Sequence, residues 1–303
     1  MLNRRHFLGT ALVTAAAAAG CATTPPDSGI LDTHTHFYDP TRPQGVPWPP
    51  KDDEFLYRPV LPTELKRIAQ PLGVTGTIVV EASSWVEDND WILQLARTEP
   101  FIKGLVGHLK PGKPNFAADL NRFAADRLFR GIRVGLWDIP LAVESTDFLR
   151  DLRLLATRGL SLDVLGGPDE IEKIAKLAAE LPDLRIVVDH CAGVRVTGGT
   201  PDAKWLSGIK TLAARKNVFM KVSGLVEGTG LRGAPIAVEF YEPVLDALWN
   251  SFSEDRVIFG SNWPVSARFA SYENVLKIVR AYVKSESAAE KYFRKNAERV
   301  YLG

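Results

Sequence analysis

The stretch Ile30-Leu31-Asp32-Thr33-His34-Thr35-His36 is a short apolar run that ends in two histidines, and it opens a series of eight such runs. Side chains alternate between the two faces of a strand, so we expect His34 and His36 on the same face, about 6.5 Å apart along the backbone. Two imidazoles that converge at the end of a strand can hold a metal ion or share the handling of a proton. The alternative is a chance pair of histidines on a half-buried strand, since three-residue motifs recur by chance.

Seven further apolar runs follow, and helical patterns separate them. The runs expected to form strands are residues 30–36, 75–82, 102–109, 131–134, 161–165, 185–190, 217–222 and 256–259. The expected helices are residues 61–70, 88–97, 115–125, 147–158, 168–180, 202–215, 240–249, 272–284 and 287–300. Eight strands that alternate with helices predict an α/β protein with a (β/α)8 barrel over residues 29–303, which the last helix pair closes from the outside. A doubly wound open sheet is the alternative, although it gives no reason for polar residues at so many strand ends.

Residues 1–21 have the composition of a targeting segment rather than of a folded domain. Arg4 and Arg5 lie in a stretch that resembles a twin-arginine export signal, and an apolar segment follows them. This segment ends at Cys21 in a sequence that resembles a bacterial lipobox, and residues 22–28 form a polar, proline-containing tether. We expect an exported protein, located in the bacterial periplasm or anchored to the membrane by a lipid on Cys21.

The composition is that of a folded domain, with 46% hydrophobic and 24% charged residues among 303. The formal net charge is +1, so nothing indicates a nucleic-acid or polyanionic partner, and the expected partner is a small-molecule substrate. Cys21 and Cys191 are the only cysteines, so lipidation of Cys21 leaves Cys191 without a disulfide partner.

Two loops are expected at the same end of the barrel. Residues 39–58 contain five prolines and several aromatic residues directly after the histidine pair, and they predict either a lid over the site or a stiff surface excursion. Residues 222–235 contain four glycines and predict a mobile loop at the same mouth.

Polar side chains stand at the C-terminal ends of the predicted strands, where the active sites of barrel enzymes lie. They are His34, His36, Glu81, His108, Arg133, Asp163, His190, Lys221 and Asn262. Ionisable groups are rare in buried positions, so this set favours a functional site. We interpret His108 as structural or loop-facing rather than catalytic, and His190, taken by itself, could also be a core histidine whose hydrogen bonds are satisfied.

Several of these groups allow two interpretations. Arg133 either forms a buried ion pair with Glu81 or binds a substrate carboxylate. Lys221 either pairs with Asp163 or binds an oxyanion. Asp189 is expected on the opposite face of its strand, where it caps a helix or pairs outside the barrel.

Four motifs occur in the order and spacing of the amidohydrolase superfamily: Asp32-Thr-His-Thr-His36, Phe129-Arg-Gly-Ile-Arg133-Val, Ile186-Val-Val-Asp-His190-Cys-Ala-Gly and Phe259-Gly-Ser-Asn-Trp-Pro-Val265. The closing segment Asn296-Ala-Glu-Arg-Val-Tyr301 adds to this likeness. From Gly29 onward the chain resembles the amidohydrolase-2 branch, with its L-fuconolactonase-like and 2-pyrone-4,6-dicarboxylate lactonase-like enzymes. The resemblance implies a (β/α)8 hydrolase that acts on a lactone or related cyclic ester of a sugar acid or small carboxylate.

The resemblance also implies a metal or a polarised carbonyl at the histidines. In such enzymes the motif histidines bind a divalent metal or polarise the carbonyl, which implies His34, His36 and His190 as the site residues and metal ligands. The fourth and fifth strands here offer Arg133 and Asp163, in place of the lysine and histidine of a two-metal site. One divalent ion such as zinc, or no metal at all, fits this sequence better.

The eighth strand departs from the family pattern. Its relatives carry an aspartate that activates water, whereas this chain has Asn262. An amide cannot act as a general base, although it can hydrogen-bond a water molecule.

The predicted function is a secreted, lactonase-type hydrolase in which water attacks an ester carbonyl. The expected substrate contacts are Glu81, Arg133, Asp163, Lys221 and Trp263. One alternative is a metal-dependent decarboxylase of the same branch. Another is a non-catalytic lipoprotein that binds sugar acids in a degenerate barrel, which Asn262 favours.

Overall fold

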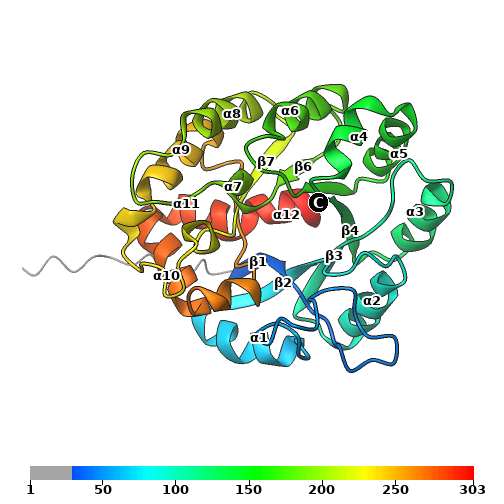
Figure 1. Ribbon diagram of the computed structural model, residues 1–303, viewed down its shortest axis with the longest axis horizontal. Helices are drawn as coiled ribbons and strands as arrows, with labels where there is room; N and C mark the ends of the chain where they lie inside the picture. Colours follow the sequence, from blue (N-terminus) through cyan, green and yellow to red (C-terminus); the bar gives the residue numbers. More distant parts are fainter. Residues whose placement is uncertain (1–28) are drawn as a thin grey trace, which may run out of the picture.

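The computed structural model describes residues 29–303, in which eight parallel strands form a barrel surrounded by helices (Figure 1). The strands pair in chain order, from β1 beside β2 to β7 beside β8. Their bounds are β1 (Ile30–Thr35), β2 (Val74–Val80), β3 (Ile102–Gly107), β4 (Phe129–Val134), β5 (Ser161–Val164), β6 (Ile186–Val188), β7 (Val218–Val222) and β8 (Val257–Phe259). The predicted (β/α)8 barrel is confirmed, and each predicted strand overlaps an observed one.

Amphipathic helices cover the outside of the barrel. Their bounds are α1 (Pro62–Ala69), α2 (Asp88–Thr98), α3 (Phe116–Ala124), α4 (Asp138–Glu144), α5 (Thr146–Thr157), α6 (Ile171–Glu180), α8 (Ala203–Ala213), α9 (Glu242–Phe252) and α10 (Tyr272–Tyr282). In α6, for example, Ile171, Ile174, Ala175 and Ala178 are buried at the spacing of one helical face. Because these helices bury the outer faces of the strands, the strands have near-continuous apolar sequences.

Backbone hydrogen bonds between β1 and the segment after β8 close the barrel. The Asn262 N–H donates to the His34 carbonyl at 2.8 Å, and the His36 N–H donates to the Trp263 carbonyl at 2.9 Å. The closure therefore fixes both histidines of the first strand next to Asn262 and Trp263.

The C-terminal segment differs from the prediction. Helix α10 packs outside, beside α1, but the chain then continues through α11 (Glu286–Glu290) and a π-helical turn, η5 (Lys291–Lys295), into α12 (Asn296–Tyr301). Ala297, Val300 and Tyr301 of α12 are buried against the residues that fill the barrel: Leu31, Ile78, Val80, Val106, Val187, Phe219 and Ile258. The expectation that the last helix closes the barrel from the outside is wrong, because its apolar face fills the barrel's end instead.

The predicted leader 1–21, the lipidation site Cys21 and the tether 22–28 lie outside the described residues. Within residues 29–303, no helix combines the length and the apolar character that crossing a membrane requires.

Candidate active site

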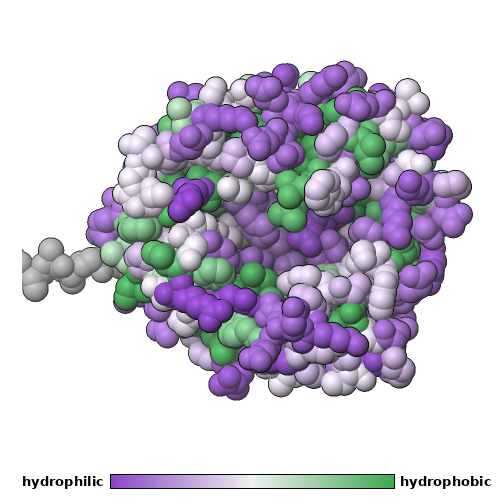
Figure 2. Space-filling view, in the orientation of Figure 1, coloured by the Kyte–Doolittle hydropathy of each residue, from purple (hydrophilic) through white to green (hydrophobic). Residues whose placement is uncertain are grey.

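Polar side chains from several strands meet at one end of the barrel, and the middle of the face in Figure 2 is a hollow lined by hydrophilic residues. Most of the predicted site residues are deeply buried there. The side chains of His34, Asp163, Asp189 and Lys221 are 0% exposed, and Asn262 is 6% exposed.

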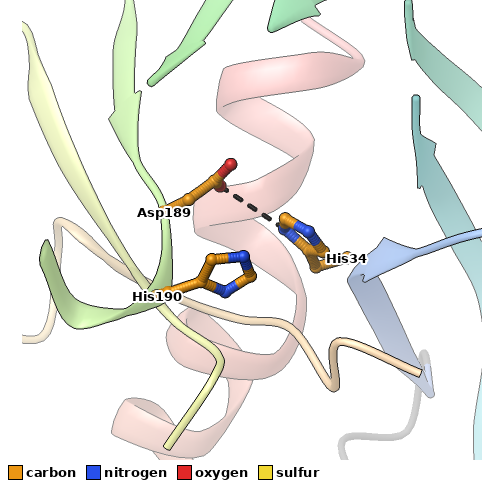
Figure 3. A group of neighbouring side chains, drawn as sticks. All are labelled: His34, Asp189 and His190. Carbon is orange, nitrogen blue, oxygen red and sulfur yellow. Dashed lines mark ion pairs between the residues drawn. The ribbon is translucent and has the colours of Figure 1, made fainter. Parts of the chain in front are cut away.

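His34, Asp189 and His190 form a compact cluster of potential metal ligands. Their candidate ligand atoms all lie within 4.8 Å of one another. The Nδ1 atom of His34 is 3.4 Å from Oδ1 of Asp189, and the rings of His34 and His190 are 4.5 Å apart between centroids. Figure 3 shows His34 projecting from β1 toward the other two side chains, which come from the end of β6.

The position of Asp189 corrects the prediction that it faces away from the barrel interior. Val187 of β6 packs among the interior residues, so Asp189, two positions later, shares that face. His190 should then point outward, but it begins a left-handed turn, α7 (His190–Gly193), in which all four φ angles lie between 52° and 64°. This turn breaks the alternation and brings the side chain of His190 into the site beside that of Asp189.

The left-handed turn is held by hydrogen bonds to Ser223, directly after β7, and to α8. The Ser223 hydroxyl accepts from the His190 N–H at 3.2 Å and lies 2.9 Å from Nδ1 of the His190 ring. The Trp205 indole N–H donates to the Cys191 carbonyl at 2.9 Å. The ring of His190 therefore has a fixed position in the cluster.

Lys221 lies between two buried carboxylates. Its Nζ atom is 2.5 Å from Asp163 and 3.0 Å from Asp189, so the structure shows the ion pair with Asp163, one of the two interpretations that the sequence left open. Burial raises the pKa of Asp163 to about 6, against the pull of the Lys221 ammonium. Burial also opposes ionisation of Asp189, but the Lys221 ammonium, together with His34 and His190, holds the pKa of Asp189 well below its usual range.

The cluster has the chemistry of a divalent-metal site. Burial lowers the pKa of His190 to about 4 and that of His34 well below its ordinary value, so both rings are neutral near pH 7. Both ring nitrogens of His34 and Oδ2 of Asp189 are buried without a hydrogen-bond partner among residues 29–303, whereas Oδ1 of Asp189 lies 3.0 Å from Lys221. Two imidazoles and a carboxylate form a typical ligand set for zinc, so these residues fit the predicted ion.

His36 lies beside this cluster but is not a member of it. Its ring centroid is 5.0 Å from that of His34, which confirms that the two histidines share a face. Its Nδ1 atom is 2.9 Å from the Val80 carbonyl oxygen, and its Nε2 atom is 3.2 Å from Oδ1 of Asn262. The candidate metal-binding group in the structure thus contains Asp189, where the sequence predicted His36.

Arg133 and Glu81 form the buried ion pair that the sequence left open. Arg133 Nε donates to a Glu81 carboxylate oxygen at 2.9 Å, and its NH2 group donates to the Glu81 carbonyl at 2.8 Å. The Arg133 side chain is still 14% exposed. Trp263 is buried and contacts Phe37, with 6.2 Å between ring centroids, so its role as a substrate contact stays a prediction.

Glu227 is a site residue that the sequence analysis did not identify. It begins a short 3-10 turn, η2 (Glu227–Thr229), in the glycine-rich loop after β7, and its Oε1 atom accepts from Nδ2 of Asn262 at 2.8 Å. Burial raises the pKa of this carboxyl to about 7. The sequence placed the loop at the mouth of the barrel, but nothing in it distinguished Glu227 from the other loop residues.

The fold and the site together define a (β/α)8 barrel enzyme whose reactive groups lie at the C-terminal ends of the strands. Residues 31–302 match the sequence model of the amidohydrolase family, in its amidohydrolase-2 branch. The chain belongs to this family and is a hydrolase, as the sequence predicted.

Two lactonases are among its relatives. The chain is 31% identical to the L-fucono-1,5-lactonase of Burkholderia ambifaria over 242 residues, which cover 78% of this chain and 80% of the relative. It is 29% identical to the L-fucono-1,5-lactonase of Burkholderia multivorans over 273 residues, which cover 86% and 91%.

A solved structure shows the same fold. An amidohydrolase from Burkholderia multivorans with bound zinc superposes with a TM-score of 0.80 at 28% identity, and the match covers 90% of this chain and 99% of that one.

Proposed function

We propose that this enzyme hydrolyses a lactone or related cyclic ester of a sugar acid or small carboxylate. The observation that carries the proposal is the cluster of His34, Asp189 and His190, which lies beside Lys221 at the mouth of the barrel. The likeness to two L-fucono-1,5-lactonases supports a sugar-acid lactone as the substrate class.

The cluster is the proposed place for one divalent ion, with His34, Asp189 and His190 as its ligands. Zinc is the first candidate, because the ligand set suits it and a related amidohydrolase was solved with zinc. Such an ion supplies a Lewis acid for the ester carbonyl. In a metal-independent reaction, the neutral rings of His34, His36 and His190 polarise the carbonyl or activate the attacking water.

The remaining groups bind and orient the reactants. The exposed part of Arg133 is proposed to attract the anionic groups of the substrate, and Lys221, buried between two carboxylates, is proposed to orient its polar groups. Glu81 and Asp163 hold these two cations in position through the observed ion pairs. Asn262 is proposed to hydrogen-bond the attacking water, since its amide has no basic carboxylate.

A panel of lactones tests the proposal. Purified enzyme, assayed after loading with zinc or manganese and after chelation, should release acid from L-fucono-1,5-lactone or a related sugar lactone. We expect kcat/KM of about 10⁴ M⁻¹s⁻¹ or more for the right substrate. His190→Ala should lower this value by at least about 100-fold, whereas Glu239→Gln, an exposed change on a neighbouring loop, should not alter it.

Two results would contradict lactone hydrolysis. Release of CO2 from aromatic or sugar carboxylates without lactone turnover would assign the chain to the decarboxylases. Tight binding of sugar acids with no turnover in any metal form would identify a binding protein.

We also propose that the protein is exported and held in the periplasm or at the membrane through Cys21. The support is the twin-arginine-like and lipobox-like sequence of residues 1–21. Fractionation of cells that express either the full chain or Cys21→Ser tests this. The wild-type protein should be in the membrane fraction, and Cys21→Ser should be in the soluble periplasmic fraction. A wild-type protein that is already soluble, or still cytoplasmic, would contradict the anchor or the export.

A further inference from the structure

The carboxyl group of Glu227 has an incomplete set of partners. Its Oε1 atom accepts from Asn262, but Oε2 is buried and has no hydrogen-bond partner among residues 29–303. No ion pair within those residues involves Glu227. A buried carboxylate without a cation is costly, so a protonated carboxyl is the more stable form in these surroundings.

The hydrogen bonds of His36 also indicate that the carboxyl group of Glu227 is protonated. Nδ1 of His36 faces the Val80 carbonyl, which only accepts, so Nδ1 carries the hydrogen of the neutral ring. Nε2 is then an acceptor, and it needs a donor from Asn262 at 3.2 Å. The oxygen and nitrogen of an amide are distinguished only by their hydrogen-bond network, so the Asn262 amide must present its NH2 group to His36.

This amide orientation requires a proton on Glu227. With its NH2 group toward His36, Asn262 turns its oxygen toward Oε1 of Glu227. Two oxygens at 2.8 Å form a hydrogen bond only when one of them carries hydrogen, and the carboxyl group is the one that can.

We propose that Glu227 is a titrating carboxyl of this active site, in addition to Asp163, and that its protonation state sets the direction of the Asn262 amide. When Glu227 is protonated, Asn262 and His36 are hydrogen-bonded to each other. When Glu227 loses its proton, Asn262 turns its NH2 group to the carboxylate, and its oxygen then faces the lone pair of His36.

The surroundings allow this change near neutral pH. Burial raises the pKa of Glu227 to about 7, and the titratable groups coupled to it are Cys191 and Tyr241. Burial raises the pKa of each of these to about 12, so neither ionises in the same range. Glu227 is therefore the group of this loop that changes charge around pH 7.

The consequence for catalysis rests on the proposed lactonase function. In the ionised state, the Asn262 oxygen and Nε2 of His36 are two acceptors without a shared hydrogen, and a water molecule that donates to them is held at the site. In the protonated state, both groups are occupied by each other. The rate of hydrolysis is therefore expected to rise with pH as Glu227 ionises, and Glu227 acts as a positioning residue.

Infrared difference spectroscopy tests the titration without any substrate. Between about pH 5 and about pH 9, the wild-type enzyme should lose the carbonyl bands of two protonated carboxyl groups, one with a midpoint near 6 from Asp163 and one with a midpoint near 7 from Glu227. Glu227→Gln should lack the band with a midpoint near 7 and keep that of Asp163, and Glu239→Gln, an exposed glutamate on a neighbouring turn, should keep both. A band with a midpoint near 7 that persists unchanged in Glu227→Gln would overturn the proposal, whatever the activity of the enzyme.

Steady-state kinetics test the link to the amide. Glutamine imitates the protonated acid because it can donate to the Asn262 oxygen, so Glu227→Gln should lose the rising limb of the pH profile and at least about 10-fold in kcat at about pH 8. Glu227→Asp keeps a carboxyl group, so its pH–rate profile should retain a rising limb, with the midpoint at a different pH. A Glu227→Gln enzyme with the wild-type pH profile would show that the carboxyl has only a structural role.

Discussion

The single ammonium group of Lys221 lies between two carboxylates, Asp163 and Asp189. With both carboxylates ionised, this buried set carries one negative charge in excess. A second cation next to Asp189 would offset it, and the imidazoles of His34 and His190 lie on that side. The local charge thus favours a divalent ion at the cluster for a reason that is independent of the geometry.

Removal of the Asp189 carboxylate should reduce metal binding. We expect Asp189→Asn to weaken zinc affinity by at least about 10-fold, because the site loses a charged ligand. His36→Ala should keep near wild-type zinc content, since His36 binds Val80 and Asn262 instead. Competition with a zinc chelator, with thermal melting as a check of folding, measures both variants.

Asp169→Asn is the matched control for this experiment. Asp169 forms an exposed ion pair with Lys204 and is not one of the proposed metal ligands. Loss of zinc in His36→Ala together with full zinc in Asp189→Asn would reverse our assignment. That outcome would restore the ligand set predicted from the sequence.

Much of the site could be predicted from single residues, because the closed barrel places the side chains at the C-terminal ends of its strands close together. His34, His190, Asp163 and Lys221 are such residues. Asp189 could not be placed, since its face depends on the register of a strand only three residues long, β6. Glu227 could not be predicted at all, because a loop residue meets Asn262 only through the folded path of the loop.

At the scale of elements, the periodic patterns located the strands and most helices, with differences of a few residues at their ends. Continuous apolar runs identify buried parallel strands well. The helix predicted over 287–300 is in fact three segments, α11, η5 and α12. Its π-helical turn has no periodic signature, since such turns insert within an otherwise helical pattern.

The left-handed turn α7 is the element that the sequence could not reveal. His190, Cys191 and Ala192 all have positive φ, which costs a non-glycine residue about 1–2 kcal/mol each. Only Gly193, the last residue of the turn, is suited to this conformation. Strain of this kind is characteristic of functional sites, and here its effect is to place His190 beside His34.

The first loop, residues 39–58, lies over the site that it follows. Trp48 contacts the ring of His36, with 5.8 Å between centroids. Asp53 of the loop pairs with Arg268 at 2.5 Å, and the Tyr38 hydroxyl donates to the Leu56 carbonyl at 3.0 Å. The loop is therefore fastened at Asp53 and Leu56, on the C-terminal side of Trp48, and its movement as a lid stays a prediction.

At the scale of the whole molecule, the C-terminal helix α12 contacts the active site from the opposite, N-terminal end of the barrel. Asn296 donates to the carbonyls of Glu254 and Val257 at the start of β8, which fixes α12 at the N-terminal end of the barrel. From there the Tyr301 hydroxyl reaches Asp163, at 2.8 and 3.0 Å from its two carboxylate oxygens. The last turn of the chain thus touches the carboxylate that pairs with Lys221.

This contact predicts that the end of the chain contributes to stability in a pH-dependent way. Tyr301→Phe removes a hydrogen bond to a buried carboxylate, which should lower the free energy of unfolding by about 1.5–3 kcal/mol at pH 8. Thermal or denaturant unfolding at several pH values measures the change. Tyr282→Phe is the matched control, because the Tyr282 hydroxyl donates to Asp246 in an exposed position and its loss should cost less.

The sign of the pH dependence follows from Asp163. Its pKa in the folded protein, about 6, is above its ordinary value of 3.8, so its contribution to stability is complete below pH 3.8 and is lost as the pH rises through 6. The Tyr301 hydroxyl lowers that pKa, so Tyr301→Phe should raise it and enlarge the loss on the alkaline side. The variant should therefore be closest to wild type near pH 5 and least stable relative to it near pH 8. An equal difference at both pH values would mean that Tyr301 stabilises the barrel through packing alone.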